Sequence, residues 1–284
     1  MTAAADLILT GGEVHSLAHP DRTFEAVAVR DGRIVRTGRA DEVGFLCGVE
    51  TRVIDLDGRV VLPGFVDAHT HLTTVGRRLV HADLAGAEGP DECVERLRER
   101  AAEVASGAVD DGGSEGNGGP DDGCDSDEDA DEWVLGFGYD ESEWDDPHYL
   151  DRGDLDAVSE SRPVVAVRED MHVVSLNSVA LARCRGEMPA AGVRREGGDP
   201  TGVVVEAAAG AVFEAIEPGP GEARDLVVAA ARYANERGVT AVHDMVRRSH
   251  APRVYRDLAR TGDLTLRVRI NYWSDHFDAL SEVG

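Results

Sequence analysis

The sequence predicts an α/β protein, with antiparallel β structure near the N-terminus and parallel βα units in the last third. Over residues 6–62, short apolar runs alternate with turn residues, and Asp-Gly pairs stand at 31–32 and 57–58. An Asp-Gly pair between alternating apolar residues is a strong hairpin signal, so two hairpins and a small sheet are expected. Residues 222–271 repeat helix and strand with short glycine loops, a pattern typical of parallel βα units.

Residues 63–71, with the sequence PGFVDAHTH, are predicted to form a buried strand whose start is embedded by Phe65 and Val66. Side chains alternate faces along a strand, so His69 and His71 should project together, with Asp67 on the same face. Two parallel neutral imidazoles form half of a site for Zn²⁺ or a similar borderline metal. The alternative is a pair of structural histidines that happen to lie two positions apart.

The middle of the chain is expected to contain a helix and then an acidic loop. Apolar residues recur on one face over 91–106, which predicts the helix. Residues 107–131 contain hardly an apolar side chain, so a disordered loop is expected there. Asp125, Asp127 and Asp129 are spaced like calcium ligands, but Ala130 replaces the glycine that an EF-hand needs, which favours a solvated loop.

The remaining elements follow from periodicity and glycine stops. Strands are expected at 133–140 and 163–168, and a helix from 177 to about 184. The last third should contain helices at 222–237 and 253–260, each stopped by a glycine and followed by strands at 239–243 and 264–271.

The composition excludes several classes of partner. The net charge is −26, from 55 acidic and 29 basic residues, and all 29 basic residues are arginine. Such an acidic excess disfavours nucleic acid and anionic membranes. Molar salt would screen the self-repulsion, so the simplest account is a cytoplasmic protein of a salt-loving organism. Without lysine, the chain can supply neither a Schiff base nor a carboxylated lysine.

The cysteines and the apolar runs also point to a reducing, aqueous compartment. Cys47, Cys93, Cys124 and Cys184 lie far apart without C-x-x-C spacing, so free thiols are expected. The N-terminus lacks the basic and apolar regions of a signal peptide, and no run approaches about 18 apolar residues. A cytoplasmic location without membrane contact is the expectation.

Residues 63–71 resemble the first barrel strand of the amidohydrolase superfamily, and most of the chain is similar to the YtcJ-like branch of amidohydrolase family 3. Relatives usually have glycine where this chain has Met171. The weaker matching segments are 136–140 with Trp144, 155–158, 162–164 with Arg168 and His172, 177–181, 199–203 with Glu206, and 238–244.

This resemblance implies a partial (β/α)₈ TIM-like barrel with a small N-terminal β-sandwich domain and an inserted α+β segment. The expected parts are 1–62 for the β-sandwich, 63–84 for the first barrel strand and metal motif, 85–215 for the insertion, and 216–284 for further βα units, with the barrel incomplete at its C-terminus. In this superfamily the other metal ligands come from later strands. The chain is therefore expected to be the N-terminal portion of a longer enzyme.

The resemblance also implies a metal-dependent hydrolase of carbon–nitrogen bonds, such as those of N-acyl or N-formyl amides or cyclic amides. His69 and His71 would bind the divalent metal, with Zn²⁺ favoured, and the metal would activate water. The expected partners are a small-molecule amide substrate and either further copies of the chain or a complementing C-terminal chain.

Four residues are candidates for catalysis: His172, Glu206, His243 and Asp244. His172 follows an apolar strand, and His243 ends a βα strand, where barrels place active residues, with Asp244 beside it. Glu206 is a lone acid in an apolar stretch. Burial would suit it for acid–base chemistry, although a solvent-facing helix position explains it equally well.

The substrate pocket is expected to be lined by Tyr139, Asp140, Trp144 and Asn177. Arg168 could pair with Asp170 or with a substrate carboxylate, and an ordinary ion pair is the favoured reading.

Two other functions stay open. The chain could be a non-catalytic remnant or one half of a split amidohydrolase, or an acidic interaction protein whose loop at 107–131 binds cations or basic partners.

Overall fold

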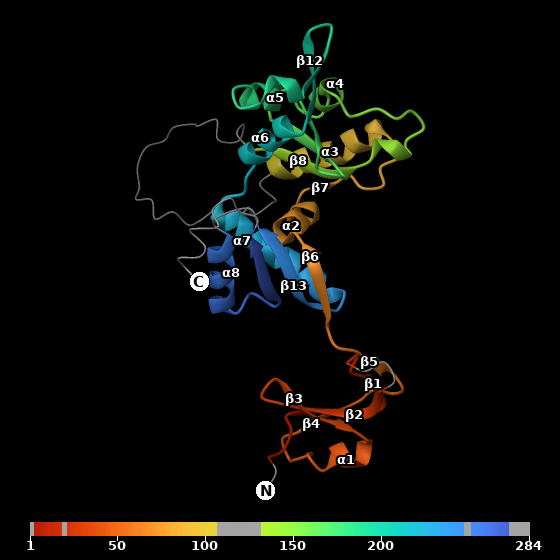
Figure 1. The fold of residues 1–284 in the computed structure, drawn as a ribbon. Coiled ribbons are helices and arrows are strands. Elements are labelled where there is room, and N and C mark those ends of the chain that lie inside the picture. Colours follow the sequence, from red (N-terminus) through yellow and green to blue (C-terminus); the bar gives the residue numbers. More distant parts are fainter. Residues whose placement is uncertain (1–2, 19–21, 107–131, 247–250, 273–284) are drawn as a thin grey trace. The chain divides into compact units, whose positions relative to one another are not determined.

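The computed structural model describes residues 3–18, 22–106, 132–246 and 251–272 (Figure 1). The chain divides into two compact units, Met1–Phe65 and Val66–Gly284. The predicted boundary at residue 62 lies close to this division. The predicted loop at 107–131, with Cys124, Asp125, Asp127 and Asp129, lies outside the described residues.

The first unit contains a five-stranded sheet. Its strands are β1 (Leu7–His15), β2 (Thr23–Arg30), β3 (Arg33–Gly38), β4 (Arg52–Asp55) and β5 (Val60–Val61), in the order β3-β2-β1-β4 with β5 also on β1. Helix α1 (Ala40–Gly44) contributes buried Val43 to a cluster with Ile8, Ala26 and Ala28. The described part of this unit holds one sheet, so the β-sandwich stays a prediction.

One of the two predicted hairpins is confirmed and the other is wrong. The Asp31-Gly32 turn joins β2 to β3, which pair antiparallel. The Asp57-Gly58 turn instead joins β4 to β5, and both of these run parallel to β1. The reason is that this turn pairs with β1, since the N–H of Gly58 donates to the carbonyl of Gly11 at 2.7 Å.

The second unit contains a three-stranded sheet, with the order β14-β13-β6, that matches the βα pattern. Its strands are β6 (Phe65–Thr70), β13 (Val239–Val246) and β14 (Arg267–Tyr272), of which β13 and β14 are parallel. Helices α2 (Leu72–Val80), α7 (Pro220–Glu236) and α8 (Ala251–Thr261) share one core with this sheet, built around Leu72, Val227, Val242 and Leu258. The alternation α7-β13-α8-β14 confirms the predicted parallel βα units.

The prediction of a buried strand at 63–71 is wrong. Phe65 and Val66 are 52% and 58% exposed, and the next three residues of β6 are also exposed. In the described part of the chain, β6 is an edge strand with β13 as its neighbour, so one side of it faces no other strand. The apolar residues at the start of the strand are therefore not packed against other residues as the sequence pattern predicted.

A six-stranded mixed sheet forms the α+β segment, in the order β11-β12-β10-β9-β8-β7. The strands are β7 (Ala82–Asp83), β8 (Val134–Tyr139), β9 (Val164–Arg168), β10 (Val173–Leu176), β11 (Val193–Glu196) and β12 (Asp199–Val205). Strands β7, β8 and β9 are parallel, whereas β10, β12 and β11 continue antiparallel. The α-helices are α3 (Pro90–Ala105), α4 (Arg152–Asp156), α5 (Ser178–Cys184) and α6 (Ala207–Ala215), and the short 3₁₀ turns are η2 (Glu141–Glu143) and η3 (Ala190–Gly192).

Strand β9 is buried on both faces, which explains its unbroken apolar run. Val165 and Val167 pack into one core cluster, and Val164 and Ala166 pack into another. A strand covered on both sides has no solvent face, so its sequence need not alternate.

Among the described cysteines, none forms a disulfide. Cys47 is exposed and free, and Cys93 and Cys184 are buried and free, as expected. Burial raises the pKa of the Cys93 thiol to about 12.

Helix α2 lies against the backbone of α7 at Gly76. A Cβ at this position would lie 2.2 Å from the carbonyl oxygen of Leu226 and 2.6 Å from its carbonyl carbon. Backbone atoms cannot swing aside as a side chain can, so the absence of a side chain at Gly76 sets the spacing of the two helices.

Gly76→Ala should therefore lower the free energy of unfolding by about 1–3 kcal/mol, because the added methyl forces α2 and α7 apart. Urea denaturation of the purified chain measures this change. The matched control is Gly210→Ala in α6, where an added Cβ meets open space. That substitution should leave stability unchanged or raise it by up to about 1 kcal/mol, as alanine favours a helix over glycine. Equal effects at the two positions would contradict the role given to Gly76.

Candidate metal half-site and its surroundings

The two histidines predicted to bind metal lie next to each other where β6 ends. The ring centroids of His69 and His71 are 5.6 Å apart, with the ring planes at 74°. His71 is the residue that precedes α2, and His69 is exposed on the edge strand. The N–H of His69 donates to Oδ1 of Asp67 at 3.0 Å, so this carboxylate fixes the local backbone.

The ring of His71 is oriented by β13. Its Nδ1 lies 3.0 Å from the carbonyl oxygen of Met245. A carbonyl can only accept a hydrogen bond, so Nδ1 carries the proton and Nε2 of the neutral ring keeps its lone pair. Histidines that bind metals commonly donate their other N–H in this way.

Asp244, which was predicted to be catalytic, is bonded within the protein. Its carboxylate is buried, with 3% exposure. Oδ1 accepts the N–H of Leu72 at the start of α2, and Oδ2 accepts the hydroxyl of Tyr255 in α8. Burial, followed by the neighbouring Asp244 carboxylate, raises the pKa of Tyr255, which keeps the phenol protonated as a donor. Nothing in the sequence around Tyr255 signalled this contact, because the two residues lie on different elements.

His243 is half-buried on β13, next to Asp244 in sequence and therefore on the other face of the strand. It pairs in register with Arg269 of β14. Its predicted catalytic role stays a prediction.

His172 and Glu206 are brought together by the β10–β12 pairing, 34 positions apart in the chain. Nδ1 of His172 lies 3.5 Å from Oε2 of Glu206, and both side chains are exposed. The burial considered for Glu206 is therefore wrong, and the solvent-facing alternative holds. Glu206 stands just before α6 with nothing packed over its side chain.

Tyr139 and Trp144 are core residues. Both are buried in one cluster with their rings stacked at 6.0 Å. The Tyr139 hydroxyl lies 3.1 Å from the Ser175 hydroxyl, and Nε1 of Trp144 donates to the carbonyl of Ala87. Their predicted place on a substrate pocket is not supported, because the aromatic rings fill the core and their polar atoms have partners inside it.

Asn177 is fully buried, and all four of its amide hydrogen-bonding positions are used within the protein. Its Oδ1 accepts from the N–H groups of Val164 and Ala180, while Nδ2 donates to the carbonyls of Ser159 and Arg162. An amide oxygen accepts two hydrogen bonds and an amide nitrogen donates two, so no position remains for a substrate. Its predicted substrate contact is thus replaced by the capping of α5.

Arg168 forms ion pairs with three carboxylates. Its predicted pairing with Asp170 is confirmed, at 2.5 Å. Its other nitrogens lie 2.8 Å from Glu141 and 3.1 Å from Asp140. Hydrogen bonds from the Ser142 hydroxyl and backbone N–H hold the pKa of Asp140 below its usual value, and Arg168 adds to this. Asp140 is therefore an ionised partner of Arg168, 28 positions away in the chain. Its predicted contact with substrate stays a prediction.

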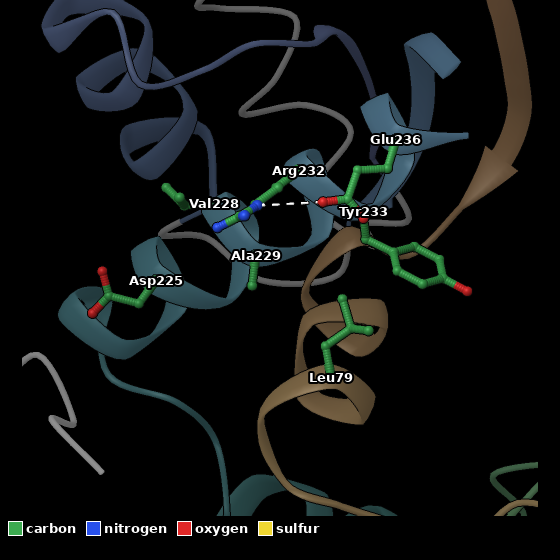
Figure 2. Close-up of a pocket in the computed structure, with 7 residues that line it drawn as sticks. All are labelled: Leu79, Asp225, Val228, Ala229, Arg232, Tyr233 and Glu236. Carbon is green, nitrogen blue, oxygen red and sulfur yellow. Dashed lines mark hydrogen bonds and ion pairs between the residues drawn. The ribbon is translucent and has the colours of Figure 1, made fainter. Parts of the chain in front are cut away.

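A surface hollow of about 380 Å³ lies between α2 and α7. Figure 2 shows Leu79 of α2 facing α7, with Arg232 and Glu236 joined by an ion pair at its rim. Its lining residues are Leu79, Asp225, Val228, Ala229, Arg232, Tyr233 and Glu236, and they include none of the predicted site residues.

Within the described ranges, no three His, Cys, Asp or Glu side chains are placed to hold one metal ion together. The metal-binding role of His69 and His71 therefore stays a prediction. The same ranges contain no helix that is long and apolar enough to cross a membrane.

These features define a mixed α/β chain with parallel βα units and an imidazole pair at a strand end. The model of the amidohydrolase family matches residues 52–284, so the chain belongs to the amidohydrolase family.

Among its relatives, the putative amidohydrolase YtcJ of Bacillus subtilis is 27% identical over 91% of this chain. The N-substituted formamide deformylase of Arthrobacter pascens is 24% identical over all of it. The chain spans 44% and 50% of the lengths of these two proteins. The crystal structure of an uncharacterized metal-dependent hydrolase from Pyrococcus horikoshii has a similar fold, with a TM-score of 0.72 at 21% identity over 98% of this chain and 50% of its own.

Tyr255→Phe should lower the free energy of unfolding by about 1–3 kcal/mol, because it removes a hydrogen bond to a buried carboxylate. The control is Tyr233→Phe in α7, whose side chain is partly exposed, and it should change stability by no more than about 0.5 kcal/mol. Urea or thermal denaturation of both variants checks the difference. If Tyr255→Phe leaves the free energy of unfolding unchanged, the hydrogen bond from Tyr255 to Asp244 does not stabilise the fold.

Proposed function

We propose that this chain contributes the imidazole half of a metal site to a hydrolase of non-peptide carbon–nitrogen bonds. Substrates would be N-acyl or N-formyl amides, or cyclic amides. The observation that carries the proposal is the pair of rings 5.6 Å apart at the end of β6, in a chain of the amidohydrolase family. The name of the formamide deformylase, which acts on N-substituted formamides, supports this class of substrate.

The donor set fits a divalent metal in part, and Zn²⁺ suits it best. Imidazole nitrogen is a common ligand of zinc, and a catalytic zinc site has three protein ligands, one more than this pair supplies. Bound there, such an ion would lower the pKa of its bound water, so that hydroxide would be present near neutral pH to attack an amide carbonyl. His71 contributes an oriented Nε2, because its Nδ1–H is held by Met245, and Asp67 steadies the backbone of His69.

We further propose that the remaining ligands come from residues beyond those described, from a complementing C-terminal chain, or from another copy of this chain. His243 would face the substrate, since it lies half-buried on β13, the strand beside β6. A cytoplasmic location in a salt-loving organism belongs to the same proposal, on the ground of the net charge of −26.

A non-catalytic remnant is the second candidate. The incomplete ligand set of the described residues favours it. Metal binding without turnover, even after the complementing chain is supplied, would support this alternative.

His69→Ala and His71→Ala should each weaken Zn²⁺ binding by the purified chain at least tenfold, as each removes one of two protein ligands. Isothermal titration calorimetry at pH 7.5 measures the affinity, with about one ion expected per wild-type chain. The matched control is His148→Ala, which removes another exposed imidazole and should leave the affinity unchanged. Equal binding by wild type and a His69/His71 double variant would refute the half-site.

Hydrolysis should be measured separately, with a panel of N-formyl and N-acyl amines in the presence and absence of a chelator. Chelator-sensitive turnover would support the hydrolase directly. Turnover that begins only when a C-terminal polypeptide is added would support a split enzyme.

A further inference from the structure

Glu206 stands at the junction of β12 and α6 in a backbone conformation that L-residues rarely adopt. Its φ is 51° and its ψ is −119°, which lies outside the small left-handed helical region. The other described non-glycine residues with positive φ are Leu17, Asp31, Asp57 and Met171, of which the two aspartates belong to Asp-Gly turns in which aspartate is tolerated. Glutamate has no such local preference, so this conformation is strained.

The packing around the junction enforces this strain. A Cβ at Gly192 would lie 2.5 Å from the carbonyl oxygen of Val205 and 2.7 Å from Cβ of Ala208, so the turn sits directly on a glycine backbone. The N–H of Glu206 donates to the carbonyl of His172, and the N–H of Gly210 donates to the carbonyl of Glu206. A strained residue persists where its surroundings fix it in this way, and such residues cluster at functional sites.

No structural reason accounts for a glutamate at this position. Its side chain is 73% exposed, so packing does not require it. It makes no capping hydrogen bond to α6. Glycine would adopt the backbone without strain. What glutamate provides and glycine lacks is a carboxylate, and its Oε2 lies 3.5 Å from Nδ1 of His172.

His172 is held in place by a separate set of contacts. Its N–H donates to Oδ1 of Asp170 at 2.9 Å, and the other oxygen of Asp170 is bound by Arg168. The imidazole is 66% exposed. In the neutral tautomer that carries its proton on Nδ1, beside Glu206, Nε2 is a hydrogen-bond acceptor on a largely exposed side chain.

We propose that Glu206 and His172 form a binding site for a ligand that carries a positively charged nitrogen group, either an ammonium or a guanidinium. Such a group donates N–H bonds to both acceptors and brings the charge opposite to that of Glu206. The negative charge of the whole chain also raises the local concentration of cations. The site uses neither His69 nor His71 and goes beyond the proposed hydrolysis.

Agmatine, which carries one ammonium and one guanidinium group, is a suitable probe. The full chain, labelled with ¹³C in its histidine rings, would be titrated at pH 8, where a free imidazole is neutral, with ionic strength held constant. Disappearance of one signal in His172→Gln identifies the His172 ring. That signal should shift and saturate with agmatine, and the shift should fall at least fivefold in Glu206→Gln.

The controls separate this site from general attraction to an acidic protein. Glu214→Gln removes an exposed carboxylate from α6, the helix that follows Glu206, and should leave the titration unchanged. A neutral amide of similar size should produce no saturable shift. The proposal is overturned if the wild-type signal does not saturate or if Glu206→Gln binds agmatine as well as wild type. It is also overturned if Glu206→Gln and Glu214→Gln lose the shift equally. The signals of His69 and His71 report on the metal half-site independently.

A second measurement tests whether the glutamate is kept at a cost to stability. Glu206→Gly should raise the urea midpoint of the chain, because glycine relieves the strained turn. Glu214→Gly, in the last turn of α6, should lower it. A lower midpoint for Glu206→Gly would show that the side chain stabilises the fold, and would remove the argument for a binding role.

Discussion

The geometry of the imidazole pair depends on one buried carboxylate. Asp244 accepts the first N–H of α2, immediately after His71, and is itself held by the hydroxyl of Tyr255. The next residue of β13, Met245, orients the ring of His71 through its carbonyl. Two adjacent residues of one strand thus fix where β6 ends, where α2 begins and which nitrogen of His71 is available. A buried carboxylate with strong donors on both oxygens is costly to disturb, which makes this junction rigid.

The inserted segment places its polar residues differently. Around Arg168 and Asn177, polar groups satisfy one another, so these residues specify the sheet and its helices. At His172 and Glu206 they lie open to solvent. The segment therefore combines a closed structural network with an exposed polar pair whose side chains can still bond another molecule.

Local patterns in the sequence predicted the helices, most strands and the closeness of His69 and His71, because periodicity and strand alternation act between neighbours. The sequence could not show the exposure of Phe65 and Val66, since burial depends on whether a second strand covers β6. It also assigned Tyr139, Trp144 and Asn177 to a pocket when their partners lie 13 to 57 positions away in the core. Contacts of that kind leave no periodic trace. The same is true of the Asp244–Tyr255 contact and of the backbone conformation of Glu206 at the junction of β12 and α6.

Among the described residues, β6 has a neighbouring strand on one side only, which has a consequence for the two rings it carries. A strand bonded to a neighbour on one side has fewer hydrogen bonds to break before it separates from its sheet, so it is among the first parts of a fold to open. His71 is anchored by the start of α2, whereas His69 lies within the edge strand. The distance between the two imidazoles is therefore governed mainly by the fluctuations of His69, and any chain that pairs with this edge would narrow the range of distances at which the rings can share an ion.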